Sequence, residues 1–204
     1  MTEPLTGLIL AGGKSSRFGS DKASALLQGR PLLQWVVGAL SEVCNAVVVV
    51  KATGQALPGF ECRVAVDVVE DLYEGKGPLA GLVTGFGSVR TPMCFATSCD
   101  APLLQPGLIQ LLADRAVGHD IVCPLVGGFL QPLVAVYRPA SCLPVFRDFV
   151  ERDLLKITAA FGPLDSVVMA ESEVAGADPG FSSFLNANRP ERLAEIAALL
   201  DSGK

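Results

Sequence analysis

A cluster of glycines, hydroxyls and cations follows the first apolar segment of the chain, in the stretch GGKSSRFGSDK at residues 12–22. Two adjacent glycines, Gly12 and Gly13, allow the backbone to approach an anion closely and to adopt positive φ. Arg17 and Lys22 carry donors that suit phosphate oxygens. The composition therefore predicts a loop that binds phosphate groups. Further donors lie between these residues, at Lys14, Ser15 and Ser16.

This loop fits neither of the two common phosphate-binding templates. The P-loop has a second glycine five residues after its first, whereas this chain has Arg17 five residues after Gly12. The dinucleotide fingerprint places its second glycine where Lys14 stands. Loops between a strand and a helix usually span roughly 2–6 residues, and the segment 12–30 is far longer. Its length and composition indicate a functional loop, and the alternative is a solvated surface loop.

A carboxylate, Asp100, comes at the end of the apolar segment 93–98. In open α/β sheets, ligands bind beyond the carboxyl ends of the strands. Proteins hold Mg²⁺ with one or two carboxylates together with phosphate oxygens. The position of Asp100 therefore predicts a ligand for Mg²⁺ beside a triphosphate, and the alternative is a residue that caps the following turn.

A third candidate is the glycine-rich segment EDLYEGKGPLAG at residues 70–81. Its glycines and Pro78 predict a tight turn into a helix, whose N-terminus could face an anion. Asp71 could accept hydrogen bonds from a base or a ribose, and Asp67 is the alternative carboxylate. The same glycine–proline start is equally typical of plain turn chemistry.

The elements that would position these residues alternate along the chain. Short, β-branched apolar runs predict buried strands, and the segments between them predict helices, several with a proline near the first turn. This alternation indicates an α/β fold with a mostly parallel central sheet covered by helices on both faces. The predicted strands are 6–11, 46–50, 63–66, 93–98, 120–125, 129–137 and 164–170, and the predicted helices are 31–43, 77–89, 105–117 and 139–153. Residues 182–200 are predicted to form a strand, a turn and a terminal amphipathic helix.

The overall composition restricts the partners and the location. Half of the 204 residues are apolar and 18% are charged, which indicates a globular protein. The net charge of −5 argues against nucleic acid and anionic membrane as partners, because both favour basic surfaces. No apolar run approaches the roughly 20 residues that span a bilayer, and no secretory signal is recognisable, so a cytoplasmic location is expected. The six cysteines include no C-x-x-C pair and, like the single His119, predict no structural metal site.

Taken together, these stretches resemble the nucleotidyltransferases of molybdenum cofactor synthesis, specifically the molybdenum cofactor guanylyltransferase (MobA) family. Its first motif is approximately L-A-G-G-x-x-x-R-M-G-x-D-K-x-L, and it is matched at residues 10–13, 17–19, 21–22 and 26. G-P-L-A-G after an acidic residue is matched at 77–81 after Asp71, and C-D-x-P at 99–102. The segments QPLVAVYR and FLNANRPERL, at 131–138 and 184–193, resemble later family segments.

The resemblance implies a three-layer, Rossmann-like nucleotidyltransferase fold. It also implies transfer of GMP from Mg²⁺-GTP to the terminal phosphate of Mo-molybdopterin, with release of pyrophosphate. One domain would span residues 1–204, with residues 1–103 mainly binding the nucleotide and residues 104–204 mainly binding the acceptor. Molybdoenzymes or their chaperones are the further partners that this activity would imply.

By position, the resemblance assigns nucleotide binding to Leu10, Ala11, Gly12, Gly13, Lys22, Asp71 and Asp100. Arg17, Lys22 and Asp100 would be catalytic, and Asp100 would also bind Mg²⁺, the one cofactor expected. Asn186 and Asn188 would line the pterin side of the cleft. Because the acceptor is itself a phosphate, the reaction needs no protein nucleophile or strong general base, and catalysis would consist of positioning and electrostatic stabilisation.

Two positions depart from the family pattern. Phe18 replaces the usual Met, and Lys51 stands where related sequences often have Asn near the base. The first alternative is therefore a cytidylyltransferase of the same fold, or a transferase that acts on a sugar phosphate or another phosphate, although the G-P-L-A-G segment favours GTP. The second alternative is a nucleotide-binding regulator without turnover. The set of Arg17, Lys22 and Asp100 argues against it, since a pure binder has less need of a metal ligand.

Overall fold

The computed structural model describes residues 3–12 and 22–202, and it confirms the predicted α/β class. The larger sheet contains β1 (Leu5–Leu10), β4 (Ala46–Lys51), β5 (Ala65–Glu70), β6 (Met93–Ser98), β7 (Ile121–Val126), β8 (Phe129–Leu130), β9 (Val134–Tyr137) and β10 (Ser166–Met169). A small hairpin consists of β2 (Leu26–Leu27) and β3 (Arg30–Pro31). The α-helices are α1 (Leu32–Val43), α2 (Gly77–Phe86), α3 (Pro106–Arg115), α4 (Pro139–Glu151), α5 (Glu171–Val174) and α6 (Pro190–Ser202), and the 3₁₀ helices are η1 (Lys22–Ser24), η2 (Ile157–Phe161) and η3 (Ser182–Phe184).

The strand order β10–β7–β9–β6–β1–β4–β5 places β1 and β6 side by side near the middle of the sheet. β6, β1, β4 and β5 run parallel to one another, as do β10 and β7, so the sheet is mostly parallel as predicted. β9 runs in the opposite direction between β6 and β7. Its first residue, Val134, therefore pairs with Thr97 near the carboxyl end of β6. The loop before β9 consequently lies at the edge where β1 and β6 end.

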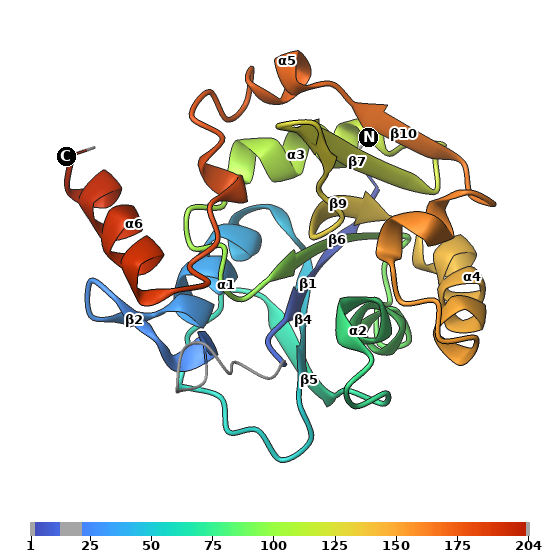
Figure 1. The fold of residues 1–204 in the computed structure, drawn as a ribbon, viewed down its shortest axis with the longest axis horizontal. Coiled ribbons are helices and arrows are strands. Elements are labelled where there is room, and N and C mark those ends of the chain that lie inside the picture. Colours follow the sequence, from blue (N-terminus) through green and yellow to red (C-terminus); the bar gives the residue numbers. More distant parts are fainter. Residues whose placement is uncertain (1–2, 13–21, 203–204) are drawn as a thin grey trace.

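Helices cover both faces of the sheet, with α1 and α3 on one side and α2 and α4 on the other (Figure 1). Leu5 and Ile9 of β1 pack with α1 and α3, whereas Leu8 and Leu10 pack with α2 and α4. Every residue of β1 is buried, and burying a leucine or isoleucine side chain contributes about 1.5–3 kcal/mol. The continuous apolar run in the sequence thus corresponds to a strand that is covered on both faces.

α2 approaches β1 closely because it carries glycine where the two elements meet. A Cβ atom at Gly85 would lie 2.4 Å from Cδ1 of Leu8, and one at Gly81 would lie 3.0 Å from Cδ2 of Leu10. Interiors are packed too densely to accept such an atom without a shift. The last glycine of the G-P-L-A-G segment therefore serves the packing of the helix on the strand.

A third apolar cluster joins segments that are far apart in the sequence. It consists of five buried side chains, which we refer to together as the third cluster: Leu27, Leu32, Leu103, Ala187 and Ile196. It packs α6 against the β2–β3 hairpin, beside which α6 lies in Figure 1. The side-chain amide of Gln28 adds a 2.7 Å hydrogen bond to the carboxylate of Asp201 in α6. One helix thus holds together the segments that follow β1 and β6.

Three predicted strands differ from the structure. The strand predicted at 129–137 is divided into β8 and β9, because Pro132 between them has no N–H to donate to a ladder. The strand predicted at 63–66 lies further along, at β5. The strand predicted at the start of 182–200 was wrong, since this segment forms η3. Phe181 immediately before it has a left-handed backbone with φ of 50°, which interrupts any extended run.

All six cysteines are free, and five of them are buried. Burial raises the pKa of Cys44, Cys123 and Cys142 to about 12, so these thiols stay protonated at neutral pH.

Across residues 3–12 and 22–202, no helix combines the length and the apolar character that crossing a membrane requires.

Candidate active site

An ion pair at the carboxyl edge of the sheet joins two of the predicted residues. Asp100 follows β6, and Lys22 is the first residue of η1; Nζ of Lys22 lies 2.8 Å from Oδ2 of Asp100. Ser98 donates a 2.5 Å hydrogen bond to Oδ1 of the same carboxylate. The side chain of Asp100 is 10% exposed and that of Lys22 is 29% exposed. The pair is therefore sheltered by the protein but open to a ligand from the solvent.

The backbone of Asp100 contacts the segment that was predicted to bind the acceptor. Its carbonyl oxygen accepts a 2.7 Å hydrogen bond from the N–H of Ala187. Asn186 and Asn188 flank Ala187, and both asparagines are exposed. The fold thus brings these two amides next to Asp100, although the two segments are far apart in the sequence.

The chain continues from β1 along the end of β4. The N–H groups of Ala11 and Gly12 donate to the carbonyl oxygen of Val50 at 2.8 and 3.1 Å. Leu10 is buried, whereas Gly12 is exposed. A Cβ atom at Gly12 would lie 2.8 Å from the backbone nitrogen of Ala52. From the sequence, a glycine was expected here because it lets the backbone approach an anion. The structure shows a second reason, which is that the backbone at Gly12 passes close to the backbone at Ala52.

Gly12→Ala is expected to push these two backbone segments apart, because the methyl group would meet atoms that cannot rotate away. We expect the affinity for a nucleoside triphosphate to fall about tenfold, since small misplacements of a binding loop are costly. The free energy of unfolding should fall by about 1–3 kcal/mol. Calorimetric titration with GTP and thermal denaturation measure the two effects. Gly59→Ala is the matched control, because nothing lies within 4 Å of its added Cβ atom, and equal GTP affinity in both variants would refute the expectation.

Asp71 lies at the carboxyl end of β5, where it fixes the turn toward α2. Its N–H donates to the carbonyl oxygen of Lys51 at 2.8 Å. Its Oδ1 accepts a 2.9 Å hydrogen bond from the hydroxyl of Thr84 and a 3.1 Å hydrogen bond from the N–H of Tyr73. Asp67, the alternative carboxylate, lies in the middle of β5. Of the two, Asp71 is the one at the edge where the other predicted residues gather.

The ammonium group of Lys51, which stands where Asn was expected, has partners of its own. Its Nζ lies 3.2 Å from Oε1 of Glu70 and donates to the carbonyl oxygen of Gln55 at 3.0 Å. The hydrogen bond from the N–H of Gly54, together with Lys51, lowers the pKa of the Glu70 carboxyl below its ordinary value. Lys51 therefore takes part in holding the segment between β4 and β5.

Gln55 is a residue of this edge that the sequence did not predict. Its Oε1 accepts a 2.8 Å hydrogen bond from the N–H of Ala52, and its Nε2 donates to the carbonyl oxygen of Ala11 at 3.1 Å. The side chain thereby ties the loop after β4 to the segment that follows β1. No motif contains Gln55, and the stretch around it, with Gly54, Pro58 and Gly59, is typical of an ordinary loop, so the sequence carried no signal for it.

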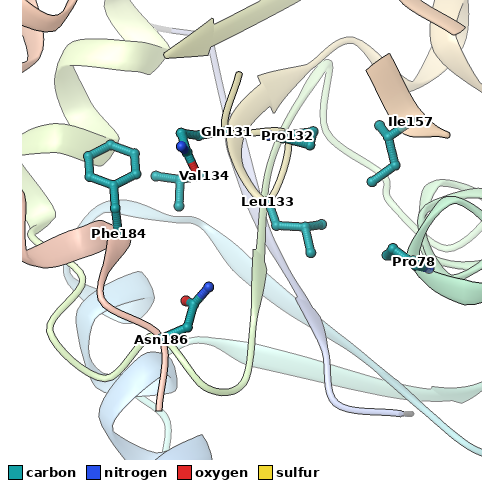
Figure 2. A pocket seen from close by; sticks show the side chains of 8 residues that line it. All are labelled: Pro78, Gln131, Pro132, Leu133, Val134, Ile157, Phe184 and Asn186. Atoms are coloured by element: carbon teal, nitrogen blue, oxygen red, sulfur yellow. The ribbon is translucent and has the colours of Figure 1, made fainter. Parts of the chain in front are cut away.

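A pocket of about 240 Å³ opens beside Asn186. Figure 2 shows the amide of Asn186 pointing toward Leu133, in the loop before β9, and Val134, the first residue of β9, with Pro78 and Ile157 across the pocket. Its walls are mostly apolar and carry a few amide groups, which suits a flat organic ring with polar edges. The remaining lining residues are Gln131, Pro132 and Phe184.

Tyr137, at the end of β9, holds the wall of this pocket in place. Its hydroxyl donates a 2.6 Å hydrogen bond to the carbonyl oxygen of Pro132. Burial raises the pKa of Tyr137 well above its ordinary value, so the phenol keeps the proton that it donates. The tyrosine of the QPLVAVYR segment thus fixes the loop that contains the proline.

Two predicted site residues, Gly13 and Arg17, lie outside the described residues. Among the residues that the structure does describe, no group of three His, Cys, Asp or Glu side chains could hold a metal ion. The carboxylate of Asp100 nevertheless fits Mg²⁺, which takes one or two carboxylates and obtains other ligands from phosphates and water. The carboxylate of Asp100 therefore suits an Mg²⁺ ion that enters the site together with a nucleotide.

His119 lies before β7, at the opposite edge of the sheet, where its Nδ1 is 2.9 Å from Asp165.

Comparison with families of known proteins gives a match over most of the chain. Residues 7–169 match the family described as the MobA-like NTP transferase domain. The chain is 31% identical over 204 residues to a molybdenum cofactor guanylyltransferase of Desulfosudis oleivorans, covering 99% of this chain and 98% of that protein. It is 34% identical over 195 residues to a probable molybdenum cofactor guanylyltransferase of Natronomonas pharaonis, covering 92% and 94%.

Solved structures share the fold at lower identity. Molybdopterin-guanine dinucleotide biosynthesis protein A from Archaeoglobus fulgidus has a TM-score of 0.79 at 21% identity, covering 97% of this chain and 99% of that chain. The 2-C-methyl-D-erythritol 4-phosphate cytidylyltransferase from Thermus thermophilus has a TM-score of 0.71 at 16% identity, covering 98% and 100%. The fold is thus one that nucleotidyltransferases with different bases and acceptors share.

Proposed function

Because this chain belongs to the family of MobA-like NTP transferases, we propose that it is a molybdenum cofactor guanylyltransferase. Its likeness to proteins of that name extends over nearly the full length of both chains. The observation in the structure that carries the proposal is the position of Asp100. Its carboxylate is paired with Lys22, and its carbonyl oxygen is bonded to Ala187 between the two asparagines.

The reaction joins two phosphates. An oxygen of the terminal phosphate of Mo-molybdopterin attacks the α-phosphorus of GTP. The bond between that phosphorus and the oxygen bridging to the β-phosphate breaks, and pyrophosphate leaves. The attacking oxygen is already ionised, so no protein base needs to take a proton from it. Molybdoenzymes or their chaperones would receive the molybdopterin guanine dinucleotide.

The proposed roles follow the positions along the edge of the sheet. The backbone of Leu10, Ala11 and Gly12, together with Asp71, would contact the nucleotide, as would Gly13. Lys22 and Arg17 would neutralise the phosphates and stabilise the charge that develops on the leaving pyrophosphate. Asn186 and Asn188 would bind the acceptor beside the pocket. In this arrangement residues 1–103 mainly bind the nucleotide and residues 104–204 mainly bind the acceptor.

Asp100 would hold Mg²⁺ through its carboxylate, as the fit of the donors suggests. When bound, the ion supplies a positive charge that polarises the phosphate oxygens and favours departure of pyrophosphate. Ser98 orients the carboxylate through its hydrogen bond, and Lys22 lies next to it. The burial of Asp100 strengthens each of these electrostatic contacts, because fewer water molecules screen them.

The test is an assay of pyrophosphate release with Mo-molybdopterin and each of GTP, CTP, ATP and UTP, in the presence of Mg²⁺. Release that requires the acceptor and is at least about tenfold faster with GTP than with CTP would support the proposal. Faster release with CTP would identify a cytidylyltransferase instead. Release that never exceeds background with any nucleotide would favour a regulator that binds nucleotide without turnover.

A further inference from the structure

Asp178 is a buried carboxylate that belongs to none of the motifs. It is 2% exposed and lies in the segment between α5 and η3. Among the described residues it forms no ion pair, and its hydrogen-bond donors are neutral groups of the chain. Burying a carboxylate is costly unless hydrogen bonds satisfy it, so its position calls for a specific role.

The carboxylate binds the segment that follows it. Oδ1 accepts hydrogen bonds of 3.0 Å from the N–H and 3.0 Å from the hydroxyl of Ser182, and Oδ2 accepts a 2.8 Å hydrogen bond from the N–H of Ser183. The carbonyl oxygen of Asp178 accepts from the N–H of Phe181 at 3.0 Å. Phe181 is held at a φ of 50°, which is unfavourable for a bulky side chain. The four hydrogen bonds to Asp178 thus stabilise a turn that the sequence itself disfavours.

The same two serines connect this turn to the segment after Asp100. The backbone N–H of Gln105 donates a 3.0 Å hydrogen bond to the hydroxyl oxygen of Ser183. The side-chain amide of Gln105 donates a 3.1 Å hydrogen bond to the hydroxyl oxygen of Ser182. The hydroxyl of Ser182 also lies 3.2 Å from the carbonyl oxygen of Leu103. Asp178 therefore anchors residues 182–183 to the stretch that carries Asp100.

The residues that follow η3 are held at a second point, the 2.7 Å hydrogen bond from Ala187 to Asp100. Between the two anchors lie Phe184 and Asn186, which line the pocket (Figure 2). The segment from 184 to 186 is thus fixed at both of its ends against the strand–loop unit of Asp100.

We propose that Asp178 is a positioning residue for the acceptor: it holds Phe184 and Asn186 at the pocket beside Asp100. This inference rests on the proposed function, because it identifies the pocket with the acceptor side of the reaction. The carboxylate of Asp178 is buried and is bonded to Ser182 and Ser183, so its loss acts through the pocket wall. The nucleotide side, at Gly12 and Asp71, has no hydrogen bond to this carboxylate.

The test is Asp178→Asn, which keeps the shape of the side chain but places an amide against two backbone N–H groups and a hydroxyl. We expect the KM for Mo-molybdopterin to rise about tenfold, with the KM for GTP unchanged within about twofold. Asp114→Asn is the matched control, because Asp114 is exposed on α3 and its carboxylate accepts a hydrogen bond from the neighbouring Gln110 of the same helix. An equal rise in both KM values, or none in the KM for Mo-molybdopterin, would overturn the proposal.

A second variant guards against loss of folding in Asp178→Asn. Ser183→Ala leaves the carboxylate and its backbone hydrogen bonds but removes the acceptor for the N–H of Gln105. Like Asp178→Asn, it should raise the KM for Mo-molybdopterin and leave the KM for GTP unchanged. If Asp178→Asn does not fold, a selective effect of Ser183→Ala supports the proposal, and an unselective one overturns it.

Hydrogen exchange separates failure of this proposal from failure of the proposed function. In Asp178→Asn, the amides of residues 182–187 should exchange at least about tenfold faster, while those of β1 and β6 should be unchanged. This readout needs no substrate. If the wild-type protein shows no guanylyl transfer, the proposed function fails, and selective exchange at 182–187 still identifies Asp178 as the anchor of the pocket wall. Unchanged exchange at these amides would contradict that role.

Discussion

Asp100→Asn is expected to lower kcat for guanylyl transfer at least about a thousandfold while the protein remains folded. An asparagine keeps one acceptor oxygen for the ammonium of Lys22, and its amide nitrogen can donate to the hydroxyl oxygen of Ser98, so the local structure is preserved. It carries no negative charge, however, and an amide oxygen is a weak ligand for Mg²⁺. The variant thus removes the proposed metal ligand and little else.

The stability of this variant should change by about 1 kcal/mol or less, since Lys22 is partly exposed and can be solvated when its partner becomes neutral. Pyrophosphate release under single-turnover conditions measures the rate, and thermal denaturation measures the fold. Asp67→Asn is the matched control, because this carboxylate lies in the middle of β5. Turnover within about tenfold of the wild type in Asp100→Asn would remove Asp100 from the catalytic residues.

Lys22→Met is expected to weaken the binding of GTP about a hundredfold, which corresponds to about 3 kcal/mol. The proposed partners of the ammonium are triphosphate oxygens, and methionine offers a side chain of similar length without the charge. Nζ of Lys22 lies 2.8 Å from Asp100, so the variant also leaves that carboxylate without its cation. Because the Asp100 side chain is only 10% exposed, the free energy of unfolding should fall as well, by about 1–3 kcal/mol.

Calorimetric titration with GTP in the presence of Mg²⁺ measures the first effect. Lys156→Met serves as the control, because Lys156 is exposed immediately before η2 and belongs to none of the predicted motifs. Lys22→Arg keeps the charge with a different geometry and should recover part of the affinity. GTP affinity in Lys22→Met equal to that of the wild type would place Lys22 among the solvated surface lysines.

The sequence was most informative where local pattern and burial coincide. The strand at 93–98 was predicted with the bounds that β6 has, because a strand buried on both faces requires an unbroken apolar run. The same run delivers Asp100 to the carboxyl edge, so its placement could be predicted together with the strand. Gly12 was recognised as a required glycine, although the contact with Ala52 that requires it is formed by a distant strand end.

The sequence was least informative where distant segments decide the structure. The reversed direction of β9 depends on its pairing with β6 and β7, and no local signal distinguishes it from a parallel strand. Gln55 acts through a hydrogen bond to Ala11, which only the packing of two loops creates. The segment that begins at Ser182 was predicted to start as a strand, yet the hydrogen bonds of Asp178 hold its serines in η3.

The third cluster has a consequence for the order in which the protein matures during translation. The ribosome adds α6 after all of the other described elements, and Ile196 of α6 packs with Leu27, Leu103 and Ala187 in this cluster. Until α6 emerges, the segments that carry Lys22 and Asp100 lack the contact with Ile196 that completes this cluster. A nascent chain that already contains every proposed catalytic residue is therefore still without a formed site. We expect activity to begin only when synthesis has passed α6, so this helix, rather than the catalytic residues themselves, determines when the site is formed.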